Sequence, residues 1–342
     1  MPISAVLTAP GQITLEDRPK QEPAKGEVVI AVEHAGVCGT DLALFKGDYP
    51  VPLPLVCGHE YVGRVVQTGP GVSSEWENQR VVAEINNTCI ARGRADLCRA
   101  CRMGLPGHCQ KRNVTGIIEK DGAFAEEVTV PAGVLLKVPD TLDPLLAVLT
   151  EPLAAALQTF EMTPVQGNET VAVLGPGRLG ILIVFAARLK GLKVFAGSRS
   201  EAKRQRALRF GATEVLPPDA LLHRVREDTE GLGADIVIDA TGTPDGITQA
   251  INMVRPRGVV SVKTTCGLPA GGLDMTKLVV DEIRLQGSRC GPFAPALDIL
   301  HAHQETLRPL ITSQRPLSET QQALESAANE DKVVLDMPVL RQ

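Results

Sequence analysis

A glycine-rich turn in the second half of the chain constrains its fold most strongly. In VAVLGPGRLG, Gly175, Gly177 and Gly180 follow an apolar strand-like segment and open a helix-like one. The first glycine allows a tight turn, the second lets a pyrophosphate approach the backbone, and the third allows close packing of the helix on the strand. Arg178 and Leu179 lie at the predicted helix start, where backbone N–H groups face the phosphates. We expect these residues to bind a dinucleotide cofactor.

Strands and helices alternate around this turn from about residue 152 onward. The apolar segments predicted as strands include KVFAGS, ADIVIDATG and GVVSVKTT, and the predicted helices include EAKRQRALRFGA and PDGITQAINMV. This alternation predicts a parallel, doubly wound sheet. The preceding part of the chain instead contains GEVVIAVEHAGV, YVGRVVQTG and GAFAEEVTV, which predict strands bounded by Gly and Pro. The expected fold class is α/β, with a β-rich part beside a dinucleotide-binding part.

The end of the strand that follows the glycine turn indicates which cofactor binds. An NAD site usually has Asp or Glu here, about 20 residues beyond the turn, but this chain has Ser198 followed by Arg199. A carboxylate would repel a 2′-phosphate, whereas a hydroxyl and a guanidinium would bind one. The sequence therefore favours NADP over NAD. The alternative is that Arg199 is a solvated surface charge.

Four of the eight cysteines crowd into one short stretch of the chain. Cys98 and Cys101 form a CxxC chelating pair, and Cys109 follows after seven residues. Tetrahedral zinc takes four thiolates in a closed structural site, so we expect a structural zinc here. Cys89 is further from the pair than a second CxxC would place it, so it could be an unrelated thiol. His108 could in principle bind instead of a cysteine.

Three separated segments carry a second set of metal-binding residue types. Cys38 lies in GVCGTD, His59 in GHEYVG and Glu151 in LTEPL. A thiolate, an imidazole and a carboxylate from separate segments can form a catalytic zinc site, which keeps a fourth position open. Each residue alone has a commoner explanation: a small core residue, a satisfied core histidine or an acid at a helix start. Their combination with a nucleotide-binding fold favours the metal.

In combination, CGTD, GHE, the cysteine cluster, EPL and the GxGxxG turn resemble the zinc-dependent alcohol dehydrogenases of the medium-chain dehydrogenase/reductase (MDR) superfamily. The resemblance covers essentially the whole chain. It implies a GroES-like zinc catalytic domain at about 1–153 and 290–342, with a Rossmann domain inserted at 154–289. It also suggests a homodimer or a homotetramer.

The resemblance assigns roles to individual residues of the metal site. Cys38 and His59 match ligands of the catalytic zinc. In the sorbitol, threonine and glucose dehydrogenase branch, which shares EPL, the glutamate of GHE or that of EPL approaches the zinc. Glu60 and Glu151 are therefore both candidates, and the sequence does not rank them. Thr40 matches the hydroxyl residue that passes on the proton of the alcohol.

Further positions match or depart from the family pattern. Asp41 matches an acid that orients a ligand histidine. Lys203 lies where the family contacts the adenosine ribose, and Lys332, in DKVVL, lies where it places a cation near the pyrophosphate. Leu42 and Ala43 stand where the family often has the histidine that ends the proton relay. We therefore expect the proton to leave through water or a cofactor hydroxyl.

Together these features predict a zinc-dependent alcohol dehydrogenase or carbonyl reductase that moves hydride between a primary or secondary alcohol and NADP(H). One alternative is a polyol or sugar dehydrogenase, which the glutamate ligand favours, although Phe45 and Tyr49 could instead line an apolar pocket. The others are a zinc-free quinone or enoyl reductase, and a non-catalytic protein that binds zinc and a nucleotide.

Charge and hydropathy limit the other partners. A net charge of −5 gives no support to nucleic-acid binding or to a basic membrane patch. The longest apolar run, near LGILIVFAA, is shorter than the ~20 residues of a membrane span. No secretion signal is visible, so we expect a cytoplasmic protein with a small-molecule substrate. We expect Cys57, Cys266 and Cys290 to be packed thiols.

Overall fold

The computed structural model describes residues 1–265, 268–327 and 330–338, so Cys266 lies outside the described residues. The chain divides into two compact units. Unit 1 comprises Met1–Glu151 and Phe293–Gln342, and unit 2 comprises Pro152–Pro292. No helix in the described part of the chain is both long and apolar enough to cross a membrane.

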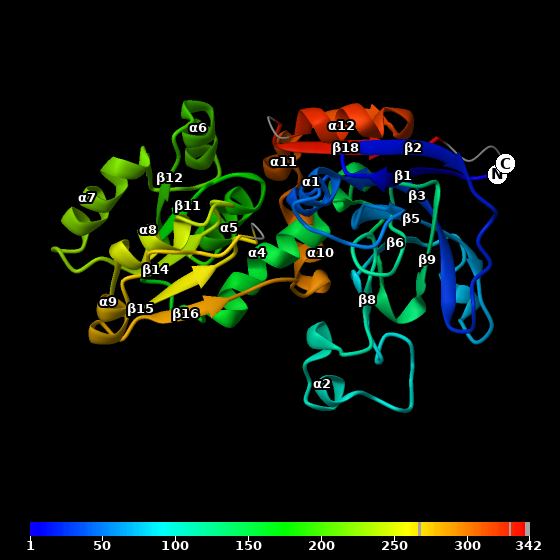
Figure 1. Ribbon diagram of the computed structural model, residues 1–342, viewed down its shortest axis with the longest axis horizontal. Coiled ribbons are helices and arrows are strands. Elements are labelled where there is room, and N and C mark those ends of the chain that lie inside the picture. The colour runs from blue at the N-terminus through cyan, green and yellow to red at the C-terminus, as the bar shows by residue number, and fades with distance from the viewer. Residues whose placement is uncertain (266–267, 328–329, 339–342) are drawn as a thin grey trace. The chain divides into compact units, whose positions relative to one another are not determined.

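Unit 1 is rich in β-structure (Figure 1). Its strands are β1 (Ile3–Ala9), β2 (Gln12–Asp17), β3 (Glu27–Gly36), β4 (Leu55–Val56), β5 (Glu60–Thr68), β6 (Arg80–Ala83), β7 (Asn86–Asn87), β8 (Asn113–Val114), β9 (Glu127–Pro131), β10 (Leu135–Lys137), β17 (Ile311–Pro316) and β18 (Lys332–Asp336). Its helices are α1 (Gly39–Lys46), α2 (Arg99–Arg102), α3 (Pro144–Ala147), α10 (Phe293–Ala302), α11 (Gln304–Leu307) and α12 (Thr320–Ser326). Its 3-10 turns are η1 (Ser74–Trp76), η2 (Pro106–His108), η3 (Ala132–Val134), η4 (Arg308–Leu310) and η5 (Leu317–Glu319).

The largest sheet of unit 1 has the strand order β10-β6-β5-β3-β18-β17, with β9 also paired to β3. Strands β2, β1 and β4 form a second sheet, and β7 pairs with β8. Apolar side chains of β3 and β5, such as Ile30 and Val65, pack with Phe124 in one buried core. Because β3 pairs with both β5 and β18, it brings segments from the two ends of the chain together.

Unit 2 is a six-stranded sheet with the order β13-β12-β11-β14-β15-β16, and all its strand pairs are parallel (Figure 1). Its strands are β11 (Thr170–Leu174), β12 (Lys193–Gly197), β13 (Glu214–Leu216), β14 (Ala234–Asp239), β15 (Val254–Val262) and β16 (Arg284–Gly287). Its helices are α5 (Arg178–Leu189), α6 (Glu201–Arg209), α7 (Pro218–Asp228), α8 (Gly246–Met253) and α9 (Met275–Val280). Helix α4 (Thr150–Met162) begins in unit 1 and continues in unit 2.

The strand order of unit 2 is that of a doubly wound dinucleotide-binding fold. Nearly all residues of the central strands β11 and β14 are buried, which is why they are continuously apolar in sequence rather than alternating. The predicted parallel, doubly wound sheet is therefore confirmed. In such sheets ligands bind outside the carboxyl ends of the strands. The glycine turn follows β11 at that edge.

Candidate functional site

Cys38, His59 and Glu60 come together in unit 1. Cys38 precedes α1, His59 directly precedes β5, and Glu60 is the first residue of β5. One ligand atom of each lies within 4.8 Å of the others. His59 and Glu60 are only 3% and 1% exposed. Among the described residues this group does not include Glu151, which lies in the first turn of α4, so the geometry favours Glu60 as the acid.

The buried carboxylate of Asp41 connects the segment that contains Cys38 with the segment that contains His59. One carboxylate oxygen of Asp41 accepts a hydrogen bond from the backbone N–H of Cys38 at 2.8 Å. The other accepts from the backbone N–H of Gly58 at 3.1 Å and lies 3.4 Å from Nδ1 of His59. Burial alone would lower the pKa of His59, but the charges of Asp41 and Cys38 raise it well above its ordinary value. With Nδ1 facing Asp41, Nε2 is the ring nitrogen left for a metal.

Two glycines provide the space that the site needs. Gly58 has φ +94°, and a Cβ there would lie 2.5 Å from Cδ1 of Phe124. A Cβ on Gly36 would lie 2.5 Å from Oε2 of Glu60. Gly58 therefore allows the turn that places His59 in the site, and Gly36 leaves room for the side chain of Glu60.

Glu60 is held by a lysine from the far end of the chain. The ammonium of Lys332, on β18, donates to Oε2 of Glu60 at 2.5 Å and to the carbonyl of Val37 at 3.3 Å. The other oxygen of Glu60, Oε1, is buried and has no hydrogen-bond partner among the described residues. A buried carboxylate oxygen without a partner is costly, and a metal ion would satisfy it. Thiolate, imidazole and carboxylate donors are those that zinc takes, so these residues fit a zinc ion.

The remaining residues predicted for this region have distinct surroundings. Thr40 lies half-buried in the first turn of α1. Phe45, on the same helix, packs in the core of unit 1, whereas Tyr49 is exposed. The role of Lys332 near the pyrophosphate stays a prediction. Its bond to Glu60 is a contact that sequence reasoning missed, because no local motif links β18 to β5.

The four clustered cysteines also come together. The sulfurs of Cys89, Cys98, Cys101 and Cys109 lie within 4.8 Å of one another, and all four side chains are buried and form no disulfide. The sulfur of Cys109 lies 3.5 Å from that of Cys89 and 3.7 Å from that of Cys98. A disulfide would need about 2.05 Å, whereas four thiolates about 2.3 Å from a tetrahedral zinc lie about 3.8 Å apart. The donor set and its spacing fit a closed zinc site that includes Cys89, while His108 is exposed.

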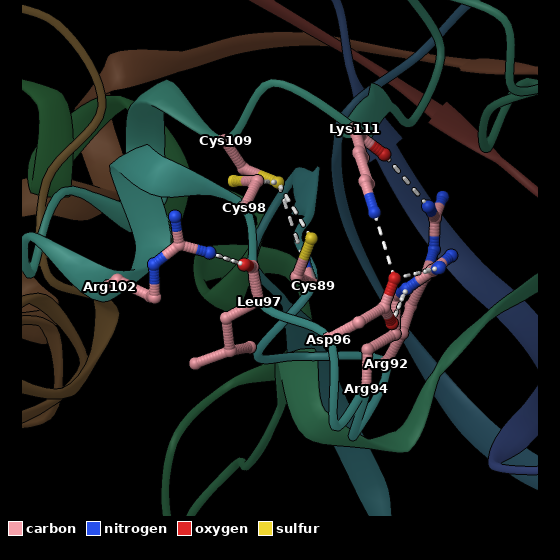
Figure 2. Close-up of polar contacts among 9 residues, drawn as sticks. All are labelled: Cys89, Arg92, Arg94, Asp96, Leu97, Cys98, Arg102, Cys109 and Lys111. Atoms are coloured by element: carbon pink, nitrogen blue, oxygen red, sulfur yellow. Dashed lines mark hydrogen bonds and ion pairs between the residues drawn. The ribbon is translucent and has the colours of Figure 1, made fainter.

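Polar contacts tie down the longer segment between Cys89 and Cys98 (Figure 2). Asp96 accepts from Arg94 and from the ammonium of Lys111, each at 2.9 Å, and these bonds hold its pKa below its usual range. Arg92 donates to the backbone carbonyl of Lys111 at 3.0 Å. The segment is thereby fastened to the residues after Cys109, so Cys89 reaches the cluster despite its long spacing.

The glycine turn of unit 2 has the geometry that its sequence predicts. Gly175 has φ +80°, and a Cβ there would lie 2.8 Å from the carbonyl oxygen of Ala240. A Cβ on Gly180 would lie 2.2 Å from the carbonyl oxygen of Gly175, so helix α5 packs closely on the turn. At Gly177, which caps α5, an added Cβ would meet open space, and that space is available to a ligand.

The strand next to the turn ends at Ser198. This residue is buried directly after β12, and Arg199 beside it is exposed. Ser200 caps α6 by accepting from the backbone N–H of Lys203. Arg204 donates to the carbonyls of Ser198 and Arg199 at 2.8 and 3.1 Å. Arg204 thus fixes the loop after β12, a role that no sequence motif signals.

Known proteins match both units. Residues 24–140 match the family model described as alcohol dehydrogenase GroES-like domain, and residues 179–302 match that described as zinc-binding dehydrogenase. An L-threonine 3-dehydrogenase of Bacillus licheniformis is 31% identical over 337 residues, which are 94% of this chain and 95% of the relative. The chain belongs to the zinc-dependent alcohol dehydrogenase family of the MDR superfamily.

Other members of this dehydrogenase family are also similar. A sorbitol dehydrogenase of Halalkalibacterium halodurans is 28% identical over 320 residues, 92% of each chain. A candidate zinc-binding dehydrogenase of Sinorhizobium meliloti 1021, solved bound to NADP, superposes with a TM-score of 0.88 at 29% identity and covers 98% of this chain and 99% of that one. An acetophenone reductase of Geotrichum candidum, solved with NAD, has a TM-score of 0.84 at 28% identity, over 98% of this chain and 97% of that one.

These matches confirm the predicted fold class, a GroES-like domain with a Rossmann sheet. They also confirm the predicted class of enzyme, a zinc-dependent oxidoreductase that uses a nicotinamide cofactor. The zinc-free reductase and the non-catalytic binding protein, both considered from the sequence, are not favoured.

Proposed function

We propose that this dehydrogenase oxidises a primary or secondary alcohol, or reduces the corresponding carbonyl compound, with NADP(H) as its preferred cofactor. The single observation that carries the proposal is the buried group of Cys38, His59 and Glu60, whose ligand atoms lie within 4.8 Å of one another. We propose these as the catalytic zinc ligands, and Glu151 is the alternative acid.

The residues of this chain divide the work of the reaction. A zinc ion bound by the three ligands would supply the Lewis acidity that makes the hydroxyl of an alcohol easier to deprotonate, and the nicotinamide would accept the hydride. Asp41 orients the ring of His59, and Lys332 holds one oxygen of Glu60. Thr40, two residues after Cys38, is the proposed hydroxyl that takes the substrate proton and passes it on.

Two features support NADP as the preferred cofactor. The position after β12 is Ser198 rather than an acid, so nothing there repels a 2′-phosphate, and the exposed Arg199 can bind one. The S. meliloti relative was solved with NADP. The proposed cofactor-binding residues are Gly175, Gly177, Arg178, Leu179, Gly180, Ser198, Arg199, Lys203 and Lys332.

A polyol, a sugar or a hydroxy amino acid is the second candidate substrate class. The relatives named as sorbitol dehydrogenase and L-threonine 3-dehydrogenase favour it. So does the carboxylate of Glu60 in the ligand group. We further propose that the four-cysteine cluster holds a structural zinc. Assembly into a homodimer or homotetramer and a cytoplasmic location stay predictions.

The test is the rate of nicotinamide reduction on a panel of secondary alcohols, polyols, aldoses and L-threonine. Each substrate is assayed with NADP⁺ and with NAD⁺, before and after treatment with a zinc chelator. We expect turnover that the chelator abolishes and added zinc restores, with a higher kcat/KM for NADP⁺. Preference for NAD⁺ would refute the cofactor proposal, and turnover that survives complete metal removal would refute the catalytic zinc.

A further inference from the structure

A cavity of about 160 Å³ lies in unit 2, at the edge of the parallel sheet where the strands begin. It is lined by Asp235, Arg255 and Arg284, at the amino ends of β14, β15 and β16, and by Met162, the last residue of α4. The glycine turn lies at the opposite edge, after β11. Strands of five or six residues, such as β11 and β14, separate the two edges by roughly 17–20 Å. A ligand in the cavity would therefore not occupy the proposed cofactor site.

Part of the lining of this cavity is apolar. Ile236 and Val259 both line it and are only 4% and 6% exposed. They pair directly across β14 and β15, so their side chains lie on the same face of the sheet. An apolar cavity of about 150 Å³ is large enough to bind benzene. The cavity in unit 2 therefore has room for a ligand of about six non-hydrogen atoms, including a short hydrocarbon part.

Thr163, directly after α4, contributes a buried hydroxyl to the same lining. This residue is only 5% exposed, and its Oγ1 has no hydrogen-bond partner among the described residues. Buried hydroxyls in proteins are nearly always hydrogen-bonded, because an unsatisfied one costs free energy. A polar atom of a ligand in the cavity would satisfy the hydroxyl of Thr163.

The charged side chains of the lining differ in whether they already have a partner. Asp235 accepts a hydrogen bond from Arg255 at 2.7 Å, so these two charges compensate each other. The carboxylate of Glu169 accepts from the backbone N–H groups of residues 166–168 at 2.7 to 3.1 Å. Arg284 is exposed and forms no ion pair in the part of the chain that the structure describes. Its guanidinium is therefore left to bind an anion, and a carboxylate matches its two parallel N–H groups.

We propose that this cavity binds a short-chain carboxylate. The carboxylate pairs with Arg284 and accepts a hydrogen bond from the hydroxyl of Thr163, while the hydrocarbon part packs against Ile236 and Val259. Inorganic phosphate offers the charge but has no apolar part to cover these two side chains, so a carboxylate fits the lining better. The site shares no residue with the metal-binding groups or with the proposed cofactor site, and the inference does not depend on the proposed function.

Methyl NMR tests the proposal at the cavity itself, because Met162 lines it. The enzyme is isotope-labelled at its methionine methyl groups, and the resonance of Met162 is assigned with Met162→Leu. Butyrate is then titrated in place of chloride at constant ionic strength. We expect the Met162 resonance to shift along a saturation curve with a Kd of about 1 mM or tighter. Uncharged butyramide should bind about tenfold more weakly or less, since it cannot form an ion pair with Arg284.

Two variants and a matched control test the individual contacts. Arg284→Gln should weaken butyrate binding about tenfold or more, and Thr163→Val about threefold or more. Thr159→Val is the control, because Thr159 also has a buried hydroxyl without a partner among the described residues, but it does not line the cavity. The control should leave the Kd within about twofold of the original. All three variants should fold, since Arg284 is exposed and neither hydroxyl has a protein partner to lose.

The proposal is overturned if butyrate, well above the expected Kd, leaves the Met162 resonance unmoved. It is also overturned if Arg284→Gln binds butyrate as tightly as the unaltered enzyme, or if Thr163→Val and Thr159→Val weaken binding equally. Butyrate bound to a metal ion elsewhere in the enzyme would show neither dependence. A shift of the Met162 resonance with inorganic phosphate but not with butyrate would overturn the choice of ligand.

Discussion

Removing the ammonium of Lys332 should destabilise unit 1 strongly, although this residue lies far along the chain from the site it supports. Lys332 and Glu60 are 4% and 1% exposed, and their charged atoms are 2.5 Å apart. The substitution Lys332→Met keeps most of the length of the side chain and removes the ammonium, together with its bonds to Glu60 and to the carbonyl of Val37. The carboxylate of Glu60 then stays buried without its ammonium partner.

The magnitude follows from the burial of the pair. Removing one partner of a buried ion pair costs about 3–5 kcal/mol, because the other charge stays buried without compensation. We expect about 3 kcal/mol in the zinc-replete protein, the lower end, because a zinc ion beside Glu60 would offset part of its charge. The double variant Glu60→Gln, Lys332→Met should cost less than the sum of the two single variants, since both charges leave together.

Urea unfolding followed by tryptophan fluorescence measures this loss of stability in unit 1. Trp76 is the only tryptophan of the chain, and it packs against the core of unit 1. The control is Arg308→Met, which breaks a pair with Asp143 whose side chains are 46% and 28% exposed and should cost less than about 1 kcal/mol. The reasoning would be refuted if Lys332→Met lost no more unfolding free energy than Arg308→Met. It would also be refuted if the loss in the double variant equalled the sum of the losses in Glu60→Gln and Lys332→Met.

Three further changes test other parts of the account. Cys89→Ser should lower the zinc content from about two to about one ion per chain, measured by mass spectrometry of the metal, while His108→Ala leaves it unchanged; an unchanged content in Cys89→Ser would remove Cys89 from the site. Gly58→Ala should destabilise unit 1 by about 2 kcal/mol or more in the same urea assay, because of the positive φ and the contact with Phe124; normal stability would contradict the tight turn. Asp41→Asn should weaken zinc binding at the catalytic site about 10–100-fold in a competition with a chelator, because the orienting charge beside His59 is lost; unaltered affinity would show that Asp41 does not orient the ligand.

The glycine turn could be read from the sequence because its requirements are local. A tight turn, an open approach and a packed helix each need a glycine within six residues, and the structure has each of these features at Gly175, Gly177 and Gly180. The alternating strands and helices around the turn likewise predicted the parallel sheet. These patterns depend on residues that are close together in the chain, so they can be recognised in a single sequence.

The remaining parts depend on contacts between distant segments. The segment between Cys89 and Cys98 is fastened by salt bridges of Asp96 with Arg94, in the same segment, and with Lys111, after Cys109, which the spacing of the cysteines does not reveal. The sequence could not rank Glu60 against Glu151, because the approach of Glu60 to Cys38 depends on the pairing of β3 with β5, which sets Gly36 opposite Glu60. The partner of Glu60, Lys332, is 272 positions away. The buried guanidinium of Arg206, on α6, donates to the carbonyl of Pro176 in the glycine turn, and no sequence motif signals this contact either.

The most direct test of the central claim is a pair of measurements on Cys38→Ser, its zinc content and its rate of nicotinamide reduction with the best substrate of the panel. Cys57→Ala is the matched control, because this buried thiol lies near the site but packs in the core. The account predicts that Cys38→Ser loses about one zinc per chain and nearly all turnover, while the control keeps both. Full turnover in a Cys38→Ser variant that lacks this zinc would contradict it.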